Sequence, residues 1–301
     1  MAGRLIMQEP PQLIAPYILV GMKGWLNAGE ISTGSIDYLR RKLGARKFAY
    51  IETQGFYIYQ IPSLSPELSM RPHTRIEDGL VMKLDIPQND FFFWKSGSDH
   101  DLILFLGVEP NLGWPEYCQI ILDVARQFHA PRIYFLGAVF DQVPHTRETR
   151  IHASVSHPRL KDELKTFAQF TNYEGPCSFT TMLLTMGYKQ EIEVAGISAR
   201  TPVYIQDLNF KVCYDLLKNI LEATFINLRS RRVSLTDFPK RFQRRLDTAA
   251  GLPTTEREQL LSALYATNWN KSKAAEKLHW SRMTLYRKMT KYHIVSSSSP
   301  K

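Results

Sequence analysis

Apolar runs alternate with amphipathic stretches along the first three quarters of the chain. The runs at 17–20, 101–107 and 132–137 are continuously apolar, as expected for strands that are buried on both faces of a sheet. Strand composition also marks residues 47–52, 55–60, 80–86, 90–94, 150–155 and 193–200. Helical spacing predicts one helix that ends at Leu43, one that begins at Arg159, and others at 115–128, 178–187 and 210–228. Strands that alternate with helices through short loops predict an α/β fold with a mostly parallel sheet flanked by helices.

The last quarter of the chain has a different pattern, with three short amphipathic segments that start at polar residues. Thr255 opens a capping box with Glu258, and apolar residues follow at helical spacing. Asn270 and Ser281 are placed to cap a second and a third helix, which a tight turn at 279–280 separates. The predicted inner faces consist of Leu260, Leu261 and Leu264, then Ala274, Ala275 and Leu278, then Leu285, Met289 and Tyr292. This pattern predicts a small all-α helix-turn-helix whose third helix can enter a DNA major groove.

Residues 270–294 resemble the DNA-binding end of the Fis family of bacterial regulators. The resemblance rests on Asn270, Ala274, Ala275, Leu278, Arg282, Thr284, Leu285, Arg287, Lys288, Lys291, Tyr292 and Ile294. His279 stands in the turn where the family usually has Gly, and His is among the residues that tolerate a left-handed conformation. The resemblance implies binding to double-stranded DNA. The alternative is a generic three-helix cap with a solvated basic face.

The outer face of the third helix supplies most of the candidate DNA contacts. The residues predicted to read base edges are Arg282, Thr284, Tyr286 and Arg287. The candidates for phosphate contacts are Lys271, Lys273, Ser281, Lys288 and Lys291. One such module touches too little DNA for high affinity, so we expect a homo-oligomer with at least two-fold symmetry and an inverted-repeat site.

The positive charge of the chain is concentrated at this end. Residues 229–301 contain 16 Lys and Arg against 5 Asp and Glu, a balance of +11, whereas residues 1–228 carry a balance of −2. A basic end and a nearly neutral body are expected when only one end binds a polyanion. Residues 229–253 are basic with apolar residues between the charges, and they either form a solvated linker or pair with DNA or another chain. The tail at 296–301 is expected to be disordered.

Five loop motifs in the first 228 residues carry a second resemblance. They are GMKGWLNAGE at 21–30, GVEP at 107–110, HTR at 145–147, YEGP at 173–176 and TPVY at 201–204. In this order they are similar to the proteasome assembly chaperone 2 (PAC2) family over about residues 14–228, although Glu148 stands where proline would be expected. The resemblance implies a nucleoside-phosphorylase-like α/β sandwich and an assembling, protein-binding role. It brings no established catalytic residue.

Polar and aromatic residues in these loops form a candidate ligand pocket, because ligand crevices of open α/β sheets lie at the carboxyl ends of the strands. The candidates are Lys23, Gly24, Trp25, Asn27, Glu30, Glu109, Trp114, His145, Thr146, Arg147 and Glu174. Several have a structural alternative. Gly24 suits a tight turn, Glu109 can cap a helix or pair with Arg147, and the two tryptophans can be core residues.

The same loops lack a signature for catalysis or for a cofactor. No Ser lies in a GxSxG turn, and the glycines match neither phosphate-binding pattern. His145, His152 and His157 match the spacing of no closed metal site. We therefore expect no catalytic residue, no metal and no cofactor, and keep an enzyme of nucleoside-phosphorylase or carboxylate–amine-ligase type as an alternative.

Composition narrows the remaining possibilities. Three cysteines without a CxxC pair fit a reducing cytoplasm, and no apolar run approaches the roughly 20 residues of a membrane span. Acidic Glu9 lies where a signal peptide would be apolar. We predict a cytoplasmic, nucleoid-associated bacterial transcriptional regulator. Its parts are an α/β domain at 1–228 for assembly or for sensing a small-molecule or protein effector, a linker at 229–253 and a helix-turn-helix at 254–295. The alternative is an assembly chaperone whose basic tail docks an acidic protein.

Overall fold

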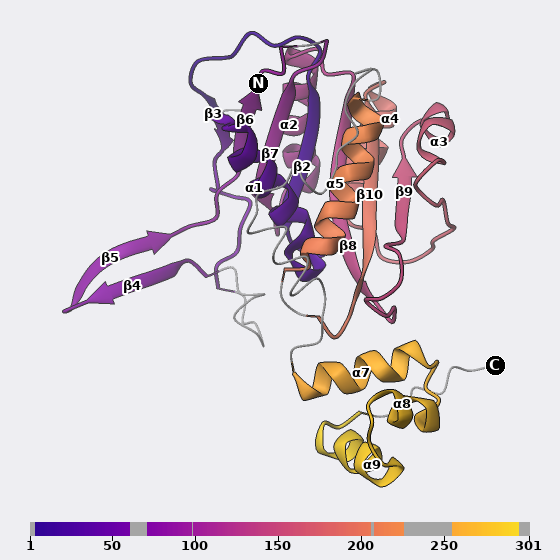
Figure 1. The fold of residues 1–301 in the computed structure, drawn as a ribbon. Coiled ribbons are helices and arrows are strands. Elements are labelled where there is room, and N and C mark those ends of the chain that lie inside the picture. Colours follow the sequence, from indigo (N-terminus) through magenta and orange to yellow (C-terminus); the bar gives the residue numbers. More distant parts are fainter. Residues whose placement is uncertain (1–3, 61–70, 98, 206–207, 226–254, 295–301) are drawn as a thin grey trace.

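The computed structural model describes residues 4–60, 71–97, 99–205, 208–225 and 255–294 of the 301-residue chain. Its larger part is an eight-stranded sheet covered by helices on both faces, and three further helices form a separate bundle beneath it (Figure 1). The predicted linker at 229–253 and the tail at 296–301 lie outside the described residues, so the domain boundaries stay a prediction.

The sheet has the strand order β1-β3-β6-β7-β2-β8-β10-β9. Its four central strands run parallel: β7 (Leu102–Val108), β2 (Tyr17–Lys23), β8 (Arg132–Asp141) and β10 (Glu193–Pro202). Antiparallel strands extend the two edges: β1 (Leu5–Met7), β3 (Arg46–Ile51), β6 (Asp90–Trp94) and, opposite these, β9 (Ile151–Val155). The predicted α/β class is confirmed, and the parallel arrangement applies to the centre of the sheet. The connection at 95–101 is too short for a parallel crossover, so β6 and β7 are antiparallel.

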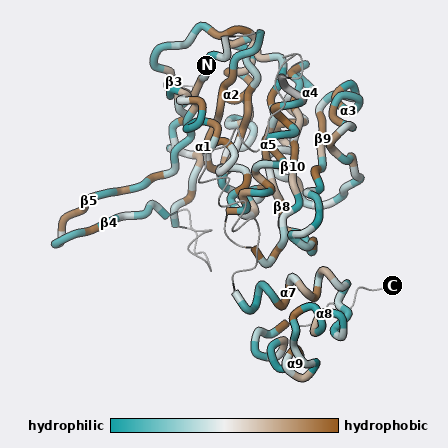
Figure 2. Tube along the Cα trace, in the orientation of Figure 1, coloured by the Kyte–Doolittle hydropathy of each residue, from teal (hydrophilic) through white to brown (hydrophobic). Residues whose placement is uncertain are grey.

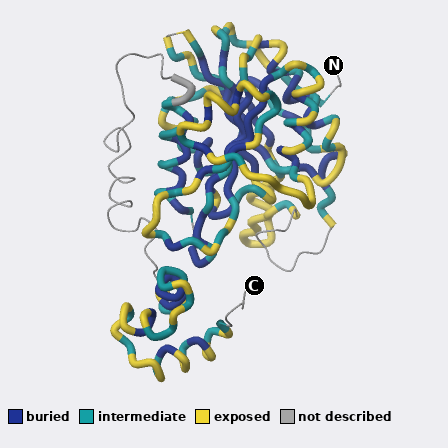
Figure 3. The backbone as a smooth tube through the Cα atoms, turned by 90° about the vertical axis from the view of Figure 1, so that its right-hand side faces the viewer, coloured by how far each residue is buried: buried dark blue, intermediate teal, exposed yellow. Residues whose placement is uncertain are grey.

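Helices cover both faces of this sheet. The helices are α1 (Ile31–Leu43), α2 (Trp114–Gln127), α3 (Arg159–Leu164), α4 (Phe179–Lys189) and α5 (Phe210–Phe225). One hydrophobic core lies between the sheet and α1, α3 and α5, and the other between the sheet and α2 and α4. Successive residues of a central strand enter different cores: Leu19 faces the first and Val20 the second. The central strands are therefore apolar throughout, as predicted, and form the dark blue centre of Figure 3.

Three segments differ from the sequence prediction. Residues 55–60 form turns instead of a strand. Phe56 and Tyr57 are buried there, but the Phe56 carbonyl accepts from the loop amides of Asn111 and Leu112, so the apolar composition reflects burial and not strand pairing. The strands β1 and β4 (His73–Glu77) were not predicted, because β1 has only three residues and β4 is mostly polar. β4 pairs with β5 (Leu80–Asp85) in a separate two-stranded hairpin.

The C-terminal bundle consists of α7 (Glu256–Ala266), α8 (Lys271–Lys277) and α9 (Arg282–Lys291). Each helix begins directly after the residue that was predicted to cap it. A short 3-10 turn, η1 (Ala28–Glu30), precedes α1 in the α/β domain. Across the described part of the chain, no helix combines the length and the apolar character needed to span a membrane.

Candidate nucleic-acid interface and loop pockets

The C-terminal helices enclose a small apolar core of their own. It consists of Leu260, Ala263, Leu264, Ala274, Ala275, Leu285 and Met289. The paired alanines are buried, which leaves room for α8 to lie close to its neighbours. One residue of the predicted inner face is placed differently, because Leu261 faces the α/β domain and not this core.

Local hydrogen bonds set the start of each helix and the turn between α8 and α9. Thr255 and Glu258 form the predicted capping box, and the Asn270 side chain accepts from the Lys273 amide at 3.1 Å. Ser281 Oγ accepts from the Thr284 amide at 3.1 Å. His279 adopts φ 54°, the left-handed conformation that was expected of the residue in place of Gly. The turn therefore closes without glycine.

The solvent face of α9 presents cationic and aromatic side chains. Arg282, Tyr286 and Arg287 are exposed, and Thr284 at its edge is half-buried. Among the described residues, neither Arg282 nor Arg287 has an ion-pair partner. The Lys271 ammonium of α8 lies 5.1 Å from the centre of the Tyr286 ring, so α8 and α9 contribute to one surface. Lys273 is also exposed on α8. The guanidinium groups of this surface can donate hydrogen bonds to base edges and to phosphates.

Glu256 at the start of α7 holds the C-terminal half of α9. Its carboxylate pairs with Lys288, accepts from the Tyr292 hydroxyl at 2.5 Å, and lies 4.0 Å from the Lys291 ammonium. These partners, Lys288 first and Tyr292 next, lower the pKa of Glu256. The Lys288 side chain is 20 % exposed and that of Lys291 is 62 % exposed. Lys288 is therefore engaged within the bundle, and Lys291 is the better placed of the two to reach a phosphate.

The bundle is docked on the α/β domain through α7. Leu261 packs against Tyr204 and Ile205, and all three are buried. The ring of Tyr265 stacks on that of Tyr204 with centroids 5.9 Å apart and an interplanar angle of 18°. We call these four residues the junction. Sequence reasoning missed it, although Leu261 and Tyr265 are four residues apart on one helix and so mark a second apolar stripe.

His145 connects the junction to the loop after β8. Its amide donates to the Tyr204 hydroxyl at 2.7 Å, and its ring Nδ1 lies 2.9 Å from the same oxygen. Nδ1 is also 3.3 Å from the Ser262 hydroxyl of α7. Burial lowers the pKa of His145, and the charges of Lys277 and Lys211 lower it further. A neutral imidazole therefore suits this contact between the two parts of the chain.

Glu109 closes the loop that follows β2. Its Oε2 accepts from the Trp25 amide at 2.8 Å, and its own amide donates to the Lys23 carbonyl at 2.7 Å. A Cβ at Gly24 would lie 2.3 Å from Oε2, so only glycine fits beneath this carboxylate. A protein carboxylate thus occupies the place where the loop amides could have held an anion, and the tight-turn explanation of Gly24 applies.

The other sequence candidates do not form one pocket. Lys23, Asn27 and Glu30 line an open hollow beside β6 and β7, where Asn27 Oδ1 accepts from the Thr33 amide at 3.0 Å and so supports the start of α1. Trp25 is exposed, but Trp114 packs on Phe179 in the core and donates its indole N–H to the Pro110 carbonyl at 2.7 Å. Trp114 is therefore placed as a core residue, the alternative that the sequence left open, and it does not face Trp25 across a pocket. Thr146 and Glu174 are exposed and line none of the described pockets.

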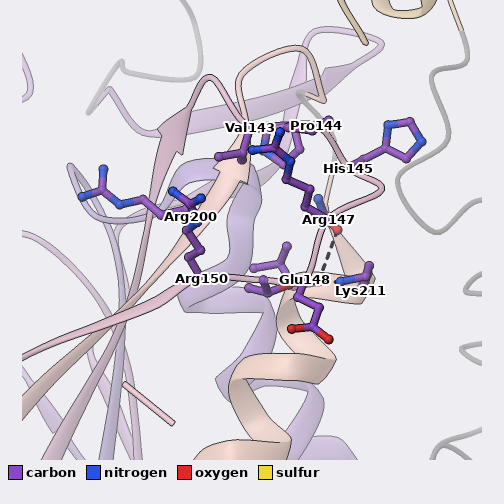
Figure 4. Close-up of a pocket in the computed structure, with 12 residues that line it drawn as sticks. Val143, Pro144, His145, Arg147, Glu148, Arg150, Arg200 and Lys211 are labelled. Carbon is purple, nitrogen blue, oxygen red and sulfur yellow. Dashed lines mark hydrogen bonds between the residues drawn. The ribbon is translucent and has the colours of Figure 1, made fainter. Parts of the chain in front are cut away.

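His145 and Arg147 belong to a second, basic pocket (Figure 4). It lies between the loop at 143–150, the end of β10 and the start of α5. Its cationic side chains are Arg147, Arg150, Arg200 and Lys211, with Glu148 among them. Lys211 donates to Asp215 at 2.8 Å and to the Thr149 hydroxyl at 3.2 Å. The cavity volume is about 20 Å³, room for about one water molecule, so this is a cluster of basic side chains around a narrow cavity. Sequence reasoning found only two of its members.

Metal-ligating clusters and cysteine thiols are the remaining groups that could carry chemistry. In the described part of the chain, no group of His, Cys, Asp and Glu is arranged to hold a metal ion. Cys118 and Cys213 are buried, and burial raises the pKa of each thiol to about 12, which disfavours the reactive thiolate. Cys177 is exposed.

Comparison with protein families and solved structures agrees with this organisation. A model described as "PAC2 family" matches residues 21–247, and one described as "Bacterial regulatory protein, Fis family" matches residues 251–292, so both predicted resemblances are confirmed. Comparison with curated proteins gives no match.

Three of the similar solved structures illustrate the shared fold. A PAC2 family protein from Streptomyces avermitilis is 24% identical with a TM-score of 0.63, over 79% of this chain and 97% of that chain. A proteasome-assembly chaperone homologue from Mycobacterium tuberculosis is 23% identical with a TM-score of 0.64, over 78% and 96%. PbaB of Pyrococcus furiosus, described as an archaeal proteasome activator, is 20% identical with a TM-score of 0.58, over 81% and 96%.

Proposed function

The chain belongs to the PAC2 family, and from that premise we propose that it is a sequence-specific DNA-binding transcriptional regulator. The Fis-family helix-turn-helix binds specific DNA sequences. The α/β domain carries this DNA-binding domain and senses a small-molecule or protein effector. A regulator of this kind acts where the chromosome is, so we place it on the nucleoid in the bacterial cytoplasm.

The observation that carries the proposal is the orientation of the bundle. α7 is the helix that contacts the α/β domain, through Leu261 and Tyr265. α9 lies on the far side of the bundle, away from the sheet (Figure 1). Arg282 and Arg287 are thereby left open to solvent while the bundle is docked. A helix that is exposed, basic and held at one end of a larger body is placed as a recognition helix must be.

Glu109 and His145, the two residues that could most readily act as a general acid or base, are hydrogen-bonded within the protein. The Glu109 carboxylate is bonded to the Trp25 amide, and His145 is bonded to Tyr204 and lies next to Ser262. A general acid–base pair needs two groups that can both reach a substrate, whereas each of these two is hydrogen-bonded to its own neighbours in the protein. This favours a binding role for the α/β domain over the enzymes considered above.

A protein-assembly role is the second candidate. Structures with this fold include proteins described as a proteasome-assembly chaperone homologue and a proteasome activator, at identities that show only the fold. The two candidates differ in the partner of the basic end. A regulator binds duplex DNA there, whereas an assembly factor binds an acidic protein surface that DNA does not displace.

The test selects binding sites from random genomic fragments and then measures affinity by fluorescence anisotropy. Arg282→Ala should weaken the selected site by about 1–3 kcal/mol, roughly 5- to 150-fold, and relax the preference at one base position. The matched control is Arg126→Ala, which removes an exposed arginine that pairs with Asp123 on α2 of the α/β domain. Equal affinities for the wild type and both variants would reject α9 as the recognition helix.

A further inference from the structure

The hairpin of β4 and β5 projects from the body of the protein as an arm (Figure 1). It forms its own two-stranded sheet, and every residue of both strands is exposed. A two-stranded hairpin without packing is at best marginally stable in water. The arm therefore lacks, within the described part of the chain, the cover that such an element needs.

The arm has one mainly charged and one mainly apolar face. Arg75 pairs with Glu77 at 2.9 Å and Lys83 with Asp85 at 2.8 Å. Residues two apart on a strand point to the same side, so these four mark the charged face.

The register places the apolar residues opposite it. Ile76 lies across from Val81, and Thr74 lies across from Leu84, with an irregularity between Arg75 and Ile76. Cross-strand partners share a face. The pairing skips Met82, so alternation along β5 is broken between Lys83 and Val81: Val81 takes the face of its partner Ile76, and Met82 that of Leu84. Leu80 lies across from Glu77 and so falls on the charged face. We define the apolar arm face as Ile76, Val81, Met82 and Leu84, which are 56–66 % exposed. Figure 2 shows brown segments along the otherwise teal arm.

No other stretch of similar length among the described residues has as many exposed large hydrophobic side chains. Six of the 14 exposed large hydrophobic side chains among the described residues lie within 76–86. The remaining eight are distributed over the rest of the α/β domain and α9. Contiguous apolar patches of this kind mark interaction sites, whereas scattered single residues do not. The best apolar counterpart that this chain offers to the arm is thus the same arm of another copy.

The charges of the arm point to the same partner. Each ion pair on the charged face is closed within the hairpin, so these four charges cancel. The arm consequently offers little to a polyanion such as DNA or to a strongly charged protein. A face that is complementary to itself forms an isologous contact, which closes around a two-fold axis.

We propose that the β4–β5 arm is the surface through which two copies of this chain associate, with the apolar arm face of one copy packed on that of the other. Strands of this length are roughly 17–20 Å long, so one face of the arm buries less than the roughly 800 Å² per partner of a standard interface. The dimer is therefore reversible and depends on protein concentration. If the proposed DNA-binding function holds, this contact also brings a second helix-turn-helix into the complex.

The first test is sedimentation or light scattering of the full chain over a wide concentration range. The wild type should pass from monomer to dimer. Met82→Asp should raise the dissociation constant by about tenfold or more, since it places a charge in the centre of an apolar contact. The matched control is Lys83→Ser on the opposite face, which should leave the constant unchanged. A wild-type chain that is monomeric throughout, or a dimer unaffected by Met82→Asp, overturns the proposal.

The second test uses crosslinking and needs no change of stability. In a Cys177→Ser background, which removes the exposed cysteine, Met82→Cys should form a disulfide-linked dimer on oxidation and Lys83→Cys should not. Equal crosslinking at both positions would contradict the face-to-face arrangement.

DNA binding provides a separate readout. Met82→Asp should retain the wild-type affinity for a single half-site and lose the cooperative gain on an inverted repeat. Failure of the wild type to bind DNA would reject the proposed function, while the arm would still be judged by the first two tests.

Discussion

Leu261→Ala should release α7 from the α/β domain without unfolding the helical bundle. Leu261 is 7 % exposed and packs on Tyr204 and Ile205, outside the core of the bundle. The substitution removes roughly three methylene equivalents at about 0.8 kcal/mol each, which amounts to about 2 kcal/mol. The value lies at the low end for buried Leu→Ala, because the two sides of a junction can relax toward each other. A loss of about 2 kcal/mol shifts the docking equilibrium roughly 30-fold toward the undocked state.

The control lies one helical turn away on the same helix. Leu264 is fully buried in the core shared by α7, α8 and α9. The same chemical change at Leu264 removes packing from a bundle of about 40 residues, a size at which a single core is marginal. Leu264→Ala should therefore unfold the bundle, whereas Leu261→Ala should leave it folded.

Hydrogen exchange on the full chain separates these outcomes. Leu261→Ala should raise the exchange rate around Tyr204 and Ile205 while the amides of α8 and α9 stay protected and half-site affinity changes less than about twofold. Leu264→Ala should remove protection throughout α7, α8 and α9 together with DNA binding. Two variants that behave alike would refute the assignment of Leu261 and Leu264 to different surfaces of α7.

Two further predictions concern charge. Lys291→Ala should reduce the slope of log DNA affinity against log salt concentration by about 0.9. Lys288→Ala should mainly lower the thermal stability of the bundle, because the Lys288 ammonium is paired with Glu256. Salt titrations of DNA binding and thermal denaturation curves distinguish the two. His145 has a lowered pKa in the folded protein, so its contribution to the junction is complete above the unfolded value of about 6.5 and is lost as the pH falls through the folded value. The protection of the junction amides, measured as hydrogen exchange corrected for the pH dependence of the intrinsic rate, should accordingly fall below about pH 6.5 in the wild type. The protection should depend less on pH in His145→Gln, and an unchanged profile would contradict the role of His145.

The parts of the fold that the sequence predicts are those determined by short-range pattern. The continuous apolar runs became central strands because each strand contributes alternately to two cores, and the helix starts followed from capping residues such as Thr255 and Ser281. The failures have a physical reason as well. Residues 55–60 are apolar because Phe56 and Tyr57 are buried by a loop, and composition cannot distinguish that burial from a strand.

The candidate pocket was harder to predict, because its contacts join distant parts of the chain. Glu109 accepts a hydrogen bond from the Trp25 amide, which is 84 residues away in the sequence. Ser262, which contacts the His145 ring, is 117 residues from it. Glu109 and His145 do lie in loops at strand ends, as the sequence predicts. Which of them is closed by a neighbour, and which remains open to a ligand, depends on contacts between loops that no local pattern encodes.

Under the proposed function, His145 is the residue through which the α/β domain could influence DNA binding. An effector shifts the docking equilibrium of the helix-turn-helix only if it binds the docked and undocked states with different affinity. His145 lines the basic pocket and also touches Tyr204 and Ser262, so a molecule that moves the loop at 143–150 must alter a junction contact. The hollow bordered by Lys23, Asn27 and Glu30 has no such contact with α7 among the described residues. Under the proposed function, a molecule that binds the exposed part of the loop at 143–150 is therefore expected to be coupled to DNA binding, and the free energy of docking limits the coupling free energy.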